Sequence, residues 1–122
     1  MGNILVIEDD QEILNMLRIM VERQGYSVTT AKNGAEGIKF FRASPADIVI
    51  TDIVMPEKEG LETILELREI YPEVKIIAVS GGGRYNPNDY LQSAKDFGAD
   101  YVFHKPFKQK EILDAIEDLF GK

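Results

Sequence analysis

Five short strand-like runs alternate along the chain with segments whose apolar residues recur every three or four positions. The runs are residues 4–7, 28–31, 48–50, 74–79 and 101–104. Apolar, β-branched runs without polar alternation are typical of strands covered on both faces, and the intervening segments predict amphipathic helices. This alternation indicates βαβ units, so the sequence predicts an α/β fold with helices packed against a five-stranded parallel sheet.

Start and stop signals support the five helices. Asp10 and Asn33 are predicted helix starts, and Glu36 strengthens the second one. Asn86 followed by Pro87 predicts the start of a fourth helix, which ends near Gly98. In the third helix, which begins near Gly60, the expected apolar residues are Leu61, Ile64, Leu65 and Leu67.

Bulk properties narrow the class of protein. The 122 residues fit one domain, so we expect residues 1–122 to form a single domain with no output domain in this chain. No apolar run is long enough to span a bilayer and no export signal is evident, so a cytoplasmic protein without membrane contact is expected. A net charge of −7 argues against nucleic-acid binding, and the absence of cysteine excludes disulfides and thiolate metal sites.

The central run, residues 48–50, leads directly to Asp52, and Met55-Pro56 prevents the strand from continuing. A parallel strand that stops there delivers Asp52 to the carboxyl edge of the sheet, where open α/β folds bind their ligands. The alternative is that Asp52 only caps the strand or begins a turn, as aspartate commonly does.

Other chemically useful residues follow the remaining strands, and parallel strands bring them to the same edge. They are Glu8, Asp9, Ser80 and Lys105. Carboxylates crowded at about 4 Å repel by about 4 kcal/mol per pair at an effective dielectric near 20, so a cation is expected among them. An all-oxygen site suits Mg²⁺ better than Zn²⁺. A metal, an ammonium and a hydroxyl around one carboxylate would stabilise phosphoryl transfer onto Asp52.

At these residues the sequence resembles the CheY-like receiver domains of two-component response regulators. The resemblance rests on residues 4–9 with their acidic pair, Thr51-Asp52 through Met55-Pro56 and Gly60, Ser80, and residues 98–100 leading to Lys105-Pro106-Phe107. It covers nearly the whole chain, and the order and spacing of the motifs are more specific than any one of them.

The resemblance implies a doubly wound, flavodoxin-like (βα)5 sheet with strand order 2-1-3-4-5. It implies that Asp52 is the phosphoacceptor, that Asp9 and Asp52 bind Mg²⁺ directly with the Val54 carbonyl, and that Glu8 acts through metal-bound water. Lys105 would pair with the acidic site and the phosphoryl oxygens, and Ser80 would bond the phosphoryl group.

The implied partner on the input side is a histidine kinase or phosphotransfer protein, or a small phosphodonor. The domain would be a signalling switch rather than an enzyme, with only its own phosphoryl transfer and slow autodephosphorylation. Phosphorylation would favour one of two packings of the face formed by the helix that begins at Asn86, the strand 101–104 and the final helix. An output protein or a second copy of the chain would bind there.

One position departs from the family pattern. The family commonly has an aromatic residue three positions before the lysine, and this chain has Val102, with Tyr101 one residue earlier. Adjacent residues of a strand point to opposite faces, so Tyr101 is not expected to replace it.

Three alternatives remain open. A degenerate receiver would bind partners without phosphorylation, although Glu8, Asp9, Asp52, Ser80 and Lys105 are all suitable for the chemistry. A Mg²⁺-dependent aspartyl phosphatase of the haloacid dehalogenase type would need a general acid where this chain has Val54. A flavodoxin-like electron carrier would need a phosphate loop after the first strand, where Glu8, Asp9 and Asp10 would repel phosphate.

Overall fold

In the computed structural model, which describes residues 2–52, 59–80, 98–104 and 106–121, five parallel strands form one sheet. The strands are β1 (Asn3–Ile7), β2 (Ser27–Ala31), β3 (Ile48–Asp52), β4 (Lys75–Ser80) and β5 (Tyr101–His104). Their order is β2-β1-β3-β4-β5, so the predicted sheet and its 2-1-3-4-5 order are confirmed.

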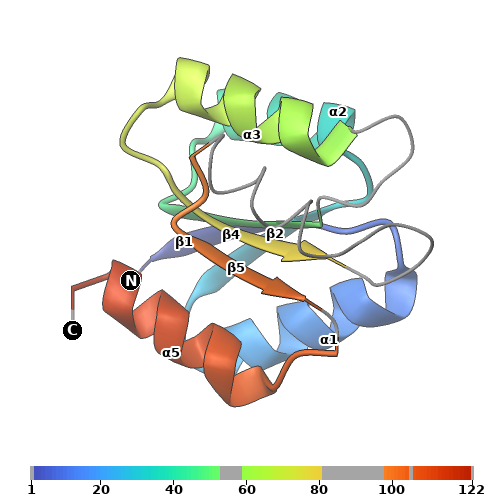
Figure 1. The fold of residues 1–122 in the computed structure, drawn as a ribbon, viewed down its shortest axis with the longest axis vertical. Helices are drawn as coiled ribbons and strands as arrows, with labels where there is room; N and C mark the ends of the chain where they lie inside the picture. The colour runs from blue at the N-terminus through green and yellow to red at the C-terminus, as the bar shows by residue number, and fades with distance from the viewer. Residues whose placement is uncertain (1, 53–58, 81–97, 105, 122) are drawn as a thin grey trace.

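Four helices are described, and they lie on both faces of the sheet (Figure 1). They are α1 (Gln11–Glu22), α2 (Gly34–Ala43), α3 (Glu59–Ile70) and α5 (Gln109–Leu119). Figure 1 shows α2 and α3 on one face and α1 and α5 on the other. The helix predicted to begin at Asn86 lies outside the described residues.

Alternate residues of each strand enter two separate cores. Leu5, Ile7 and Val49 pack with Phe41 of α2 and with the inner side of α3. Ile4, Val6 and Ile50 pack with buried residues of α1 and α5. Both faces of the central strands are therefore covered, which explains why β1 and β3 lack polar alternation.

The two helix starts predicted from single residues are confirmed. Asp10 caps α1, because its carboxylate accepts the N–H groups of Glu12 at 2.9 Å and Ile13 at 3.3 Å. Asn33 caps α2 by accepting the N–H of Glu36 at 2.7 Å. These caps satisfy amide groups that a helix leaves without internal partners.

One expected core residue is wrong. Leu65 of α3 is 45% exposed, whereas Thr63 of the same helix is buried. A helix turns by about 100° per residue, which places Leu65 and Thr63 each about 100° from the middle of the face shared by Leu61, Ile64 and Leu67, on opposite sides of it. The half-buried Ile70, which packs against the core, lies on the Thr63 side. The polar residue therefore faces the core, and the leucine faces solvent.

The two aromatic residues of β5 face α5, as expected from the position of Val102 between them. Tyr101 and Phe103 pack in the core shared by α1 and α5, whereas Val102 packs in the core beneath α2 and α3. Tyr101 therefore does not replace the aromatic residue usual at position 102, as predicted.

Candidate functional site

The strand register brings the ends of the central strands together. Ile7 of β1 pairs with Thr51 of β3, so Glu8 and Asp52 are the next residues on neighbouring strands. Asp52 in turn pairs with Val79 of β4, and Ser80 pairs with His104 of β5. In Figure 1 the arrowheads of β4 and β5 point toward the same edge, at which α1 begins. The convergence expected for parallel strands is thus present in the backbone.

Three carboxylates gather at this edge. One carboxylate oxygen from each of Glu8, Asp9 and Asp52 lies within 4.8 Å of the others. Glu8 is 1% exposed and Asp52 is 4% exposed, whereas Asp9 is exposed. The cluster therefore combines two buried acids with one acid, Asp9, that solvent reaches.

A hydrogen bond that the sequence did not predict helps to orient this cluster. The carboxylate of Glu8 accepts the backbone N–H of Asp10 at 3.1 Å. Asp10 itself caps α1 and is not part of the cluster. The sequence signal for this contact was the run of three acidic residues at the end of β1, in which the first can fold back onto the third.

The cluster fits a hard divalent cation. Like charges 4.8 Å apart repel by about 3 kcal/mol per pair at an effective dielectric of about 20. A cation relieves that repulsion, and carboxylate oxygens are the ligands that Mg²⁺ and Ca²⁺ prefer. Because two of the three acids are buried, solvent alone cannot screen them well. The residues present therefore suit a metal ion, as the sequence predicted.

The remaining predicted site residues are placed only in part. The backbone of Ser80 ends β4, one residue beyond the partner of Asp52. Lys105 and Val54 lie outside the described residues, so their assigned roles stay predictions.

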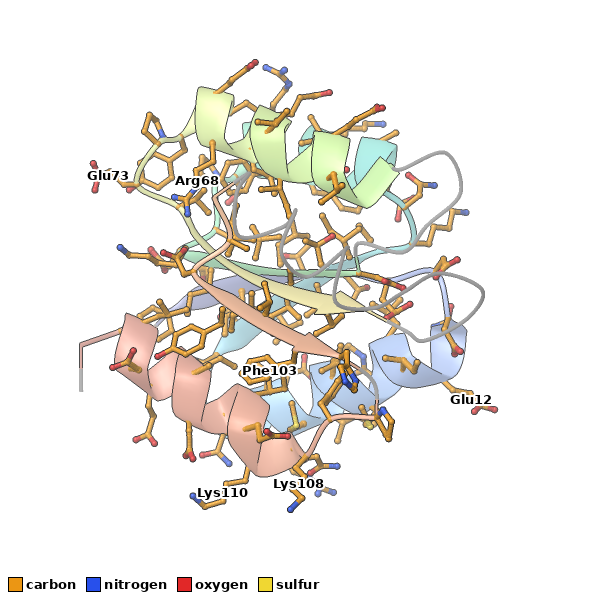
Figure 2. The ribbon with its side chains drawn as sticks, in the orientation of Figure 1. Glu12, Arg68, Glu73, Phe103, Lys108 and Lys110 are labelled. Atoms are coloured by element: carbon orange, nitrogen blue, oxygen red, sulfur yellow. The ribbon has the colours of Figure 1, made fainter. Side chains whose placement is uncertain are left out.

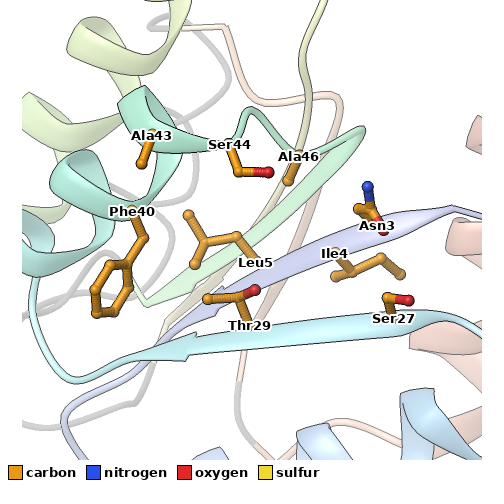
Figure 3. A pocket seen from close by; sticks show the side chains of 9 residues that line it. All are labelled: Asn3, Ile4, Leu5, Ser27, Thr29, Phe40, Ala43, Ser44 and Ala46. Atoms are coloured by element: carbon orange, nitrogen blue, oxygen red, sulfur yellow. The ribbon is translucent and has the colours of Figure 1, made fainter.

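A surface hollow lies at the opposite edge of the sheet. It encloses about 320 Å³ and is lined by the beginnings of β1 and β2 and by the end of α2 (Figure 3). Its lining residues are Asn3, Ile4, Leu5, Ser27, Thr29, Phe40, Ala43, Ser44 and Ala46. None of these lining residues is acidic or basic, so this hollow does not share the chemistry of the carboxylate cluster.

Known proteins match this arrangement over almost the whole chain. The model of the response regulator receiver domain family matches residues 4–117. The chemotaxis protein CheY of Halobacterium salinarum is 30% identical over 116 residues, which cover 95% of this chain and 94% of that protein.

Solved structures agree. A response regulator receiver domain protein from Clostridium thermocellum is 30% identical, with a TM-score of 0.87 and coverage of 98% of this chain and 94% of that chain. A response regulator protein from Burkholderia pseudomallei is 26% identical, with a TM-score of 0.81 and coverage of 100% and 76%. That second structure is described as holding a phosphorylated aspartic acid, a calcium ion and citrate.

The family match, the strand order and the acidic edge agree with one another. Phosphorylation and magnesium binding are typical of the matched family. No helix among the described residues has the length and apolar character needed to cross a membrane. The chain therefore belongs to the response regulator receiver domain family of two-component signal transduction.

Proposed function

We propose that Asp52 accepts a phosphoryl group from the phosphohistidine of a histidine kinase or phosphotransfer protein, or from a small acyl phosphate. A carboxylate oxygen of Asp52 attacks phosphorus, the bond to the donor breaks, and its electron pair leaves with the donor. The observation that carries this proposal is the position of Asp52, which is 4% exposed and within 4.8 Å of two further carboxylates.

Asp9 and Asp52 would hold Mg²⁺ directly with the Val54 carbonyl, and Glu8 would act through a metal-bound water. When bound, the ion would neutralise charge on the acids and on the phosphoryl oxygens. Asp9 is the exposed member of the cluster, so it would be the first ligand that an incoming ion meets. The phosphorylated aspartic acid and calcium ion described for the Burkholderia pseudomallei protein support this pairing.

Ser80 would donate its hydroxyl to a phosphoryl oxygen, and Lys105 would offset negative charge on the phosphoryl group. Their support is the register, because Ser80 follows the strand partner of Asp52 and Lys105 follows His104, which pairs with Ser80. Ser80 is the last residue of β4, and Lys105 follows the last residue of the neighbouring strand β5.

The output surface would include β5 and α5. Receiver domains of this family interact with kinases and partner proteins, and some are linked to output domains. The hydroxyl of Tyr101 on β5 donates a hydrogen bond to Asp118 on α5. Because this bond joins the two elements, a shift of β5 on phosphorylation would be passed to α5, and a partner there would read the change.

The competing assignments have less support. A degenerate receiver would leave unused five residues that suit phosphoryl transfer, namely Glu8, Asp9, Asp52, Ser80 and Lys105. A phosphatase of the haloacid dehalogenase type needs a general acid two residues after its nucleophile. This chain has Val54 at that position, and valine cannot donate a proton. Family membership favours neither that phosphatase nor an electron carrier.

The test is the intact mass of the protein after incubation with acetyl phosphate and Mg²⁺. We expect a gain of one phosphoryl group, which is lost in Asp52→Asn and when EDTA removes the metal. The matched control is Asp114→Asn, which neutralises an exposed acid on α5 that pairs with Lys110 at 2.9 Å. This control should be phosphorylated as the original chain is.

Thermal melts of Asp52→Asn must first show a folded protein. If the original chain then gains no phosphoryl group from acetyl phosphate or from a panel of phosphorylated histidine kinases, the degenerate receiver becomes the better assignment. If Asp52→Asn gains the group as readily as the original chain, another residue is the acceptor and the proposal is wrong.

A further inference from the structure

The exposed faces of α2 and α3 carry opposite charges. On α2, Lys39 and Arg42 are exposed, and its acidic residue Glu36 is half-buried and accepts the N–H of Lys32 at 3.0 Å. On α3, the exposed ionisable side chains are carboxylates, namely Glu62, Glu66 and Glu69. One helix thus presents a basic surface, and its neighbour presents an acidic one.

Within the part of the chain that the structure describes, these charges form no ion pairs with one another. The two helices contact each other on the same face of the sheet (Figure 1), yet the described residues show no ion pair between them. Arg68, the cation of α3, donates a hydrogen bond to the carboxylate of Asp100 at 3.0 Å, so it pairs outside the two helices. The basic and acidic surfaces therefore both face outward.

An apolar residue lies within the acidic surface. Leu65 is 45% exposed and stands between Glu62 and Glu66 in the sequence of α3. Burial of an exposed leucine in a contact is favourable, whereas carboxylates need a partner of opposite charge when they lose water. The face therefore offers both an apolar contact and charges that need complements.

We propose that the α2–α3 face is an interface between two copies of this chain. Both helices follow parallel strands and run in the same direction, so a twofold axis parallel to them places α2 of each copy over α3 of the other. At about 1.5 Å per residue, Lys39 and Arg42 lie about 7.5 and 12 Å from the start of α2, and Glu62, Glu66 and Glu69 lie about 4.5, 10.5 and 15 Å from the start of α3. Where the starts of α2 and α3 face each other across the twofold axis, the cations of one copy fall between the carboxylates of the other.

A second copy fits this face better than an unrelated partner. A uniformly basic partner would meet Lys39 and Arg42, and a uniformly acidic one would meet the α3 carboxylates. The partner must place acidic side chains over α2 and basic side chains over α3. A second copy related by a twofold axis does so with its own α3 and α2.

The test is a set of charge reversals followed by sedimentation of the unphosphorylated protein in about 0.15 M salt, where the Debye length is about 8 Å. We expect the original chain to dimerise, and we expect Lys39→Glu/Arg42→Glu and Glu62→Lys/Glu66→Lys each to weaken the dimer by about tenfold or more. An equimolar mixture of the two variants should restore a dimer, because both contacts become complementary again.

The second variant separates local complementarity from net charge. It makes the chain less negative than −7, so a dimer limited only by overall repulsion would become tighter, whereas the proposal requires it to weaken. The control Arg18→Glu/Arg23→Glu makes the same charge change as the α2 variant but acts on α1, across the sheet, and should leave the dimer unchanged.

A monomer at about 1 mM of the original chain would overturn the proposal and favour a separate partner for this face. A dimer that survives both reversals would also overturn it, because another surface would then hold the copies together. Neither result depends on phosphorylation, so the proposed function could stand in either case.

Discussion

Tyr101 of β5 donates a hydrogen bond from its hydroxyl to the carboxylate of Asp118 on α5. The ring of Tyr101 also stacks on Phe103, with ring centroids 6.1 Å apart and an interplanar angle of 7°. The hydrogen bond to Asp118 raises the pKa of Tyr101 above its usual value of 10.0, with smaller contributions from desolvation and from the charges of Asp118 and Asp100. The folded state therefore favours the neutral tyrosine.

Replacement of this tyrosine should change how stability responds to alkaline pH. Since the pKa of Tyr101 is higher in the folded than in the unfolded chain, its contribution is fully present below pH 10 and is lost as pH rises through the folded value. Tyr101→Phe has no hydroxyl to ionise, so it does not lose this contribution at alkaline pH. The urea midpoint of the variant should therefore fall less between about pH 9 and pH 12 than that of the original chain. Parallel pH curves for the two proteins would contradict the expectation.

Gly37 should not tolerate alanine, although alanine is normally the better helix former. A Cβ at this position of α2 would lie 2.4 Å from Cδ1 and 2.8 Å from Cγ1 of Ile7. Because Ile7 is fully buried, it cannot move without disturbing the core, and overpacking of this kind costs about 1–3 kcal/mol. Urea denaturation should show that loss for Gly37→Ala.

The matched control for Gly37 is Ile7→Val, which removes the Cδ1 atom. Gly37→Ala should cost less in that background, with a coupling of about 0.5 kcal/mol or more. If the two changes were additive, the contact between Gly37 and Ile7 would not be the cause.

Arg68 should be important for stability, because its guanidinium joins three parts of the chain (Figure 2). It donates hydrogen bonds to the carbonyls of Pro72, Val74 and Gly98 and to the carboxylate of Asp100. Arg68→Ala leaves the part-buried carbonyls of Val74 and Gly98 without that donor, and the free energy of unfolding should fall by about 2–3 kcal/mol. Arg68→Lys has too few donors to replace the fork and should recover only part of the loss.

For Arg68, Arg18→Ala is the control, because Arg18 makes an exposed i,i+4 pair with Glu22 at 2.9 Å. Exposed pairs of that type contribute about 0.3–0.5 kcal/mol. If urea denaturation showed the same decrease in the free energy of unfolding for both alanine variants, the contacts of Arg68 would stabilise the fold no more than an exposed ion pair does.

Magnesium should raise the melting temperature through the carboxylate cluster. At about ten times its dissociation constant, a ligand that binds only the folded state adds about 1.4 kcal/mol of stability. Asp9→Asn should remove most of that gain, because it deletes the exposed ligand of the cluster, whereas Asp47→Asn should retain it. Scanning calorimetry with MgCl₂ and with NaCl of equal ionic strength measures both effects.

Most strands were predictable because they are apolar runs bounded by residues that stop them, whereas β2 is a short run that includes two threonines. The prediction for residues 101–104 matches β5 at both ends, and the central run does end at Asp52. The convergence of Glu8, Asp9 and Asp52 was also predictable, because parallel strands deliver their carboxyl ends to one edge. These results needed only local sequence and one rule of topology.

Contacts between distant side chains were not predictable in the same way. The sequence places Arg68 in the last turn of a helix, where it could equally have faced solvent, and only the structure shows its contacts with Gly98 and Asp100. The hydrogen bond between Tyr101 and Asp118 depends on how β5 and α5 pack together. Leu65 was predicted wrongly because Leu65 and Thr63 lie equally far from the middle of the apolar face of α3, so the helical pattern does not show which of them is buried.

The contacts of Arg68 have a consequence for engineering. Residues 81–97 are preceded by Ser80, which pairs with His104, and are followed by Gly98, whose carbonyl Arg68 binds. The alignment of β5 with β4 is therefore anchored on both sides by bonds that do not involve the intervening residues. An engineered variant of this chain should therefore keep Arg68, because its bond to the carbonyl of Gly98 links α3 to the residues that lead into β5.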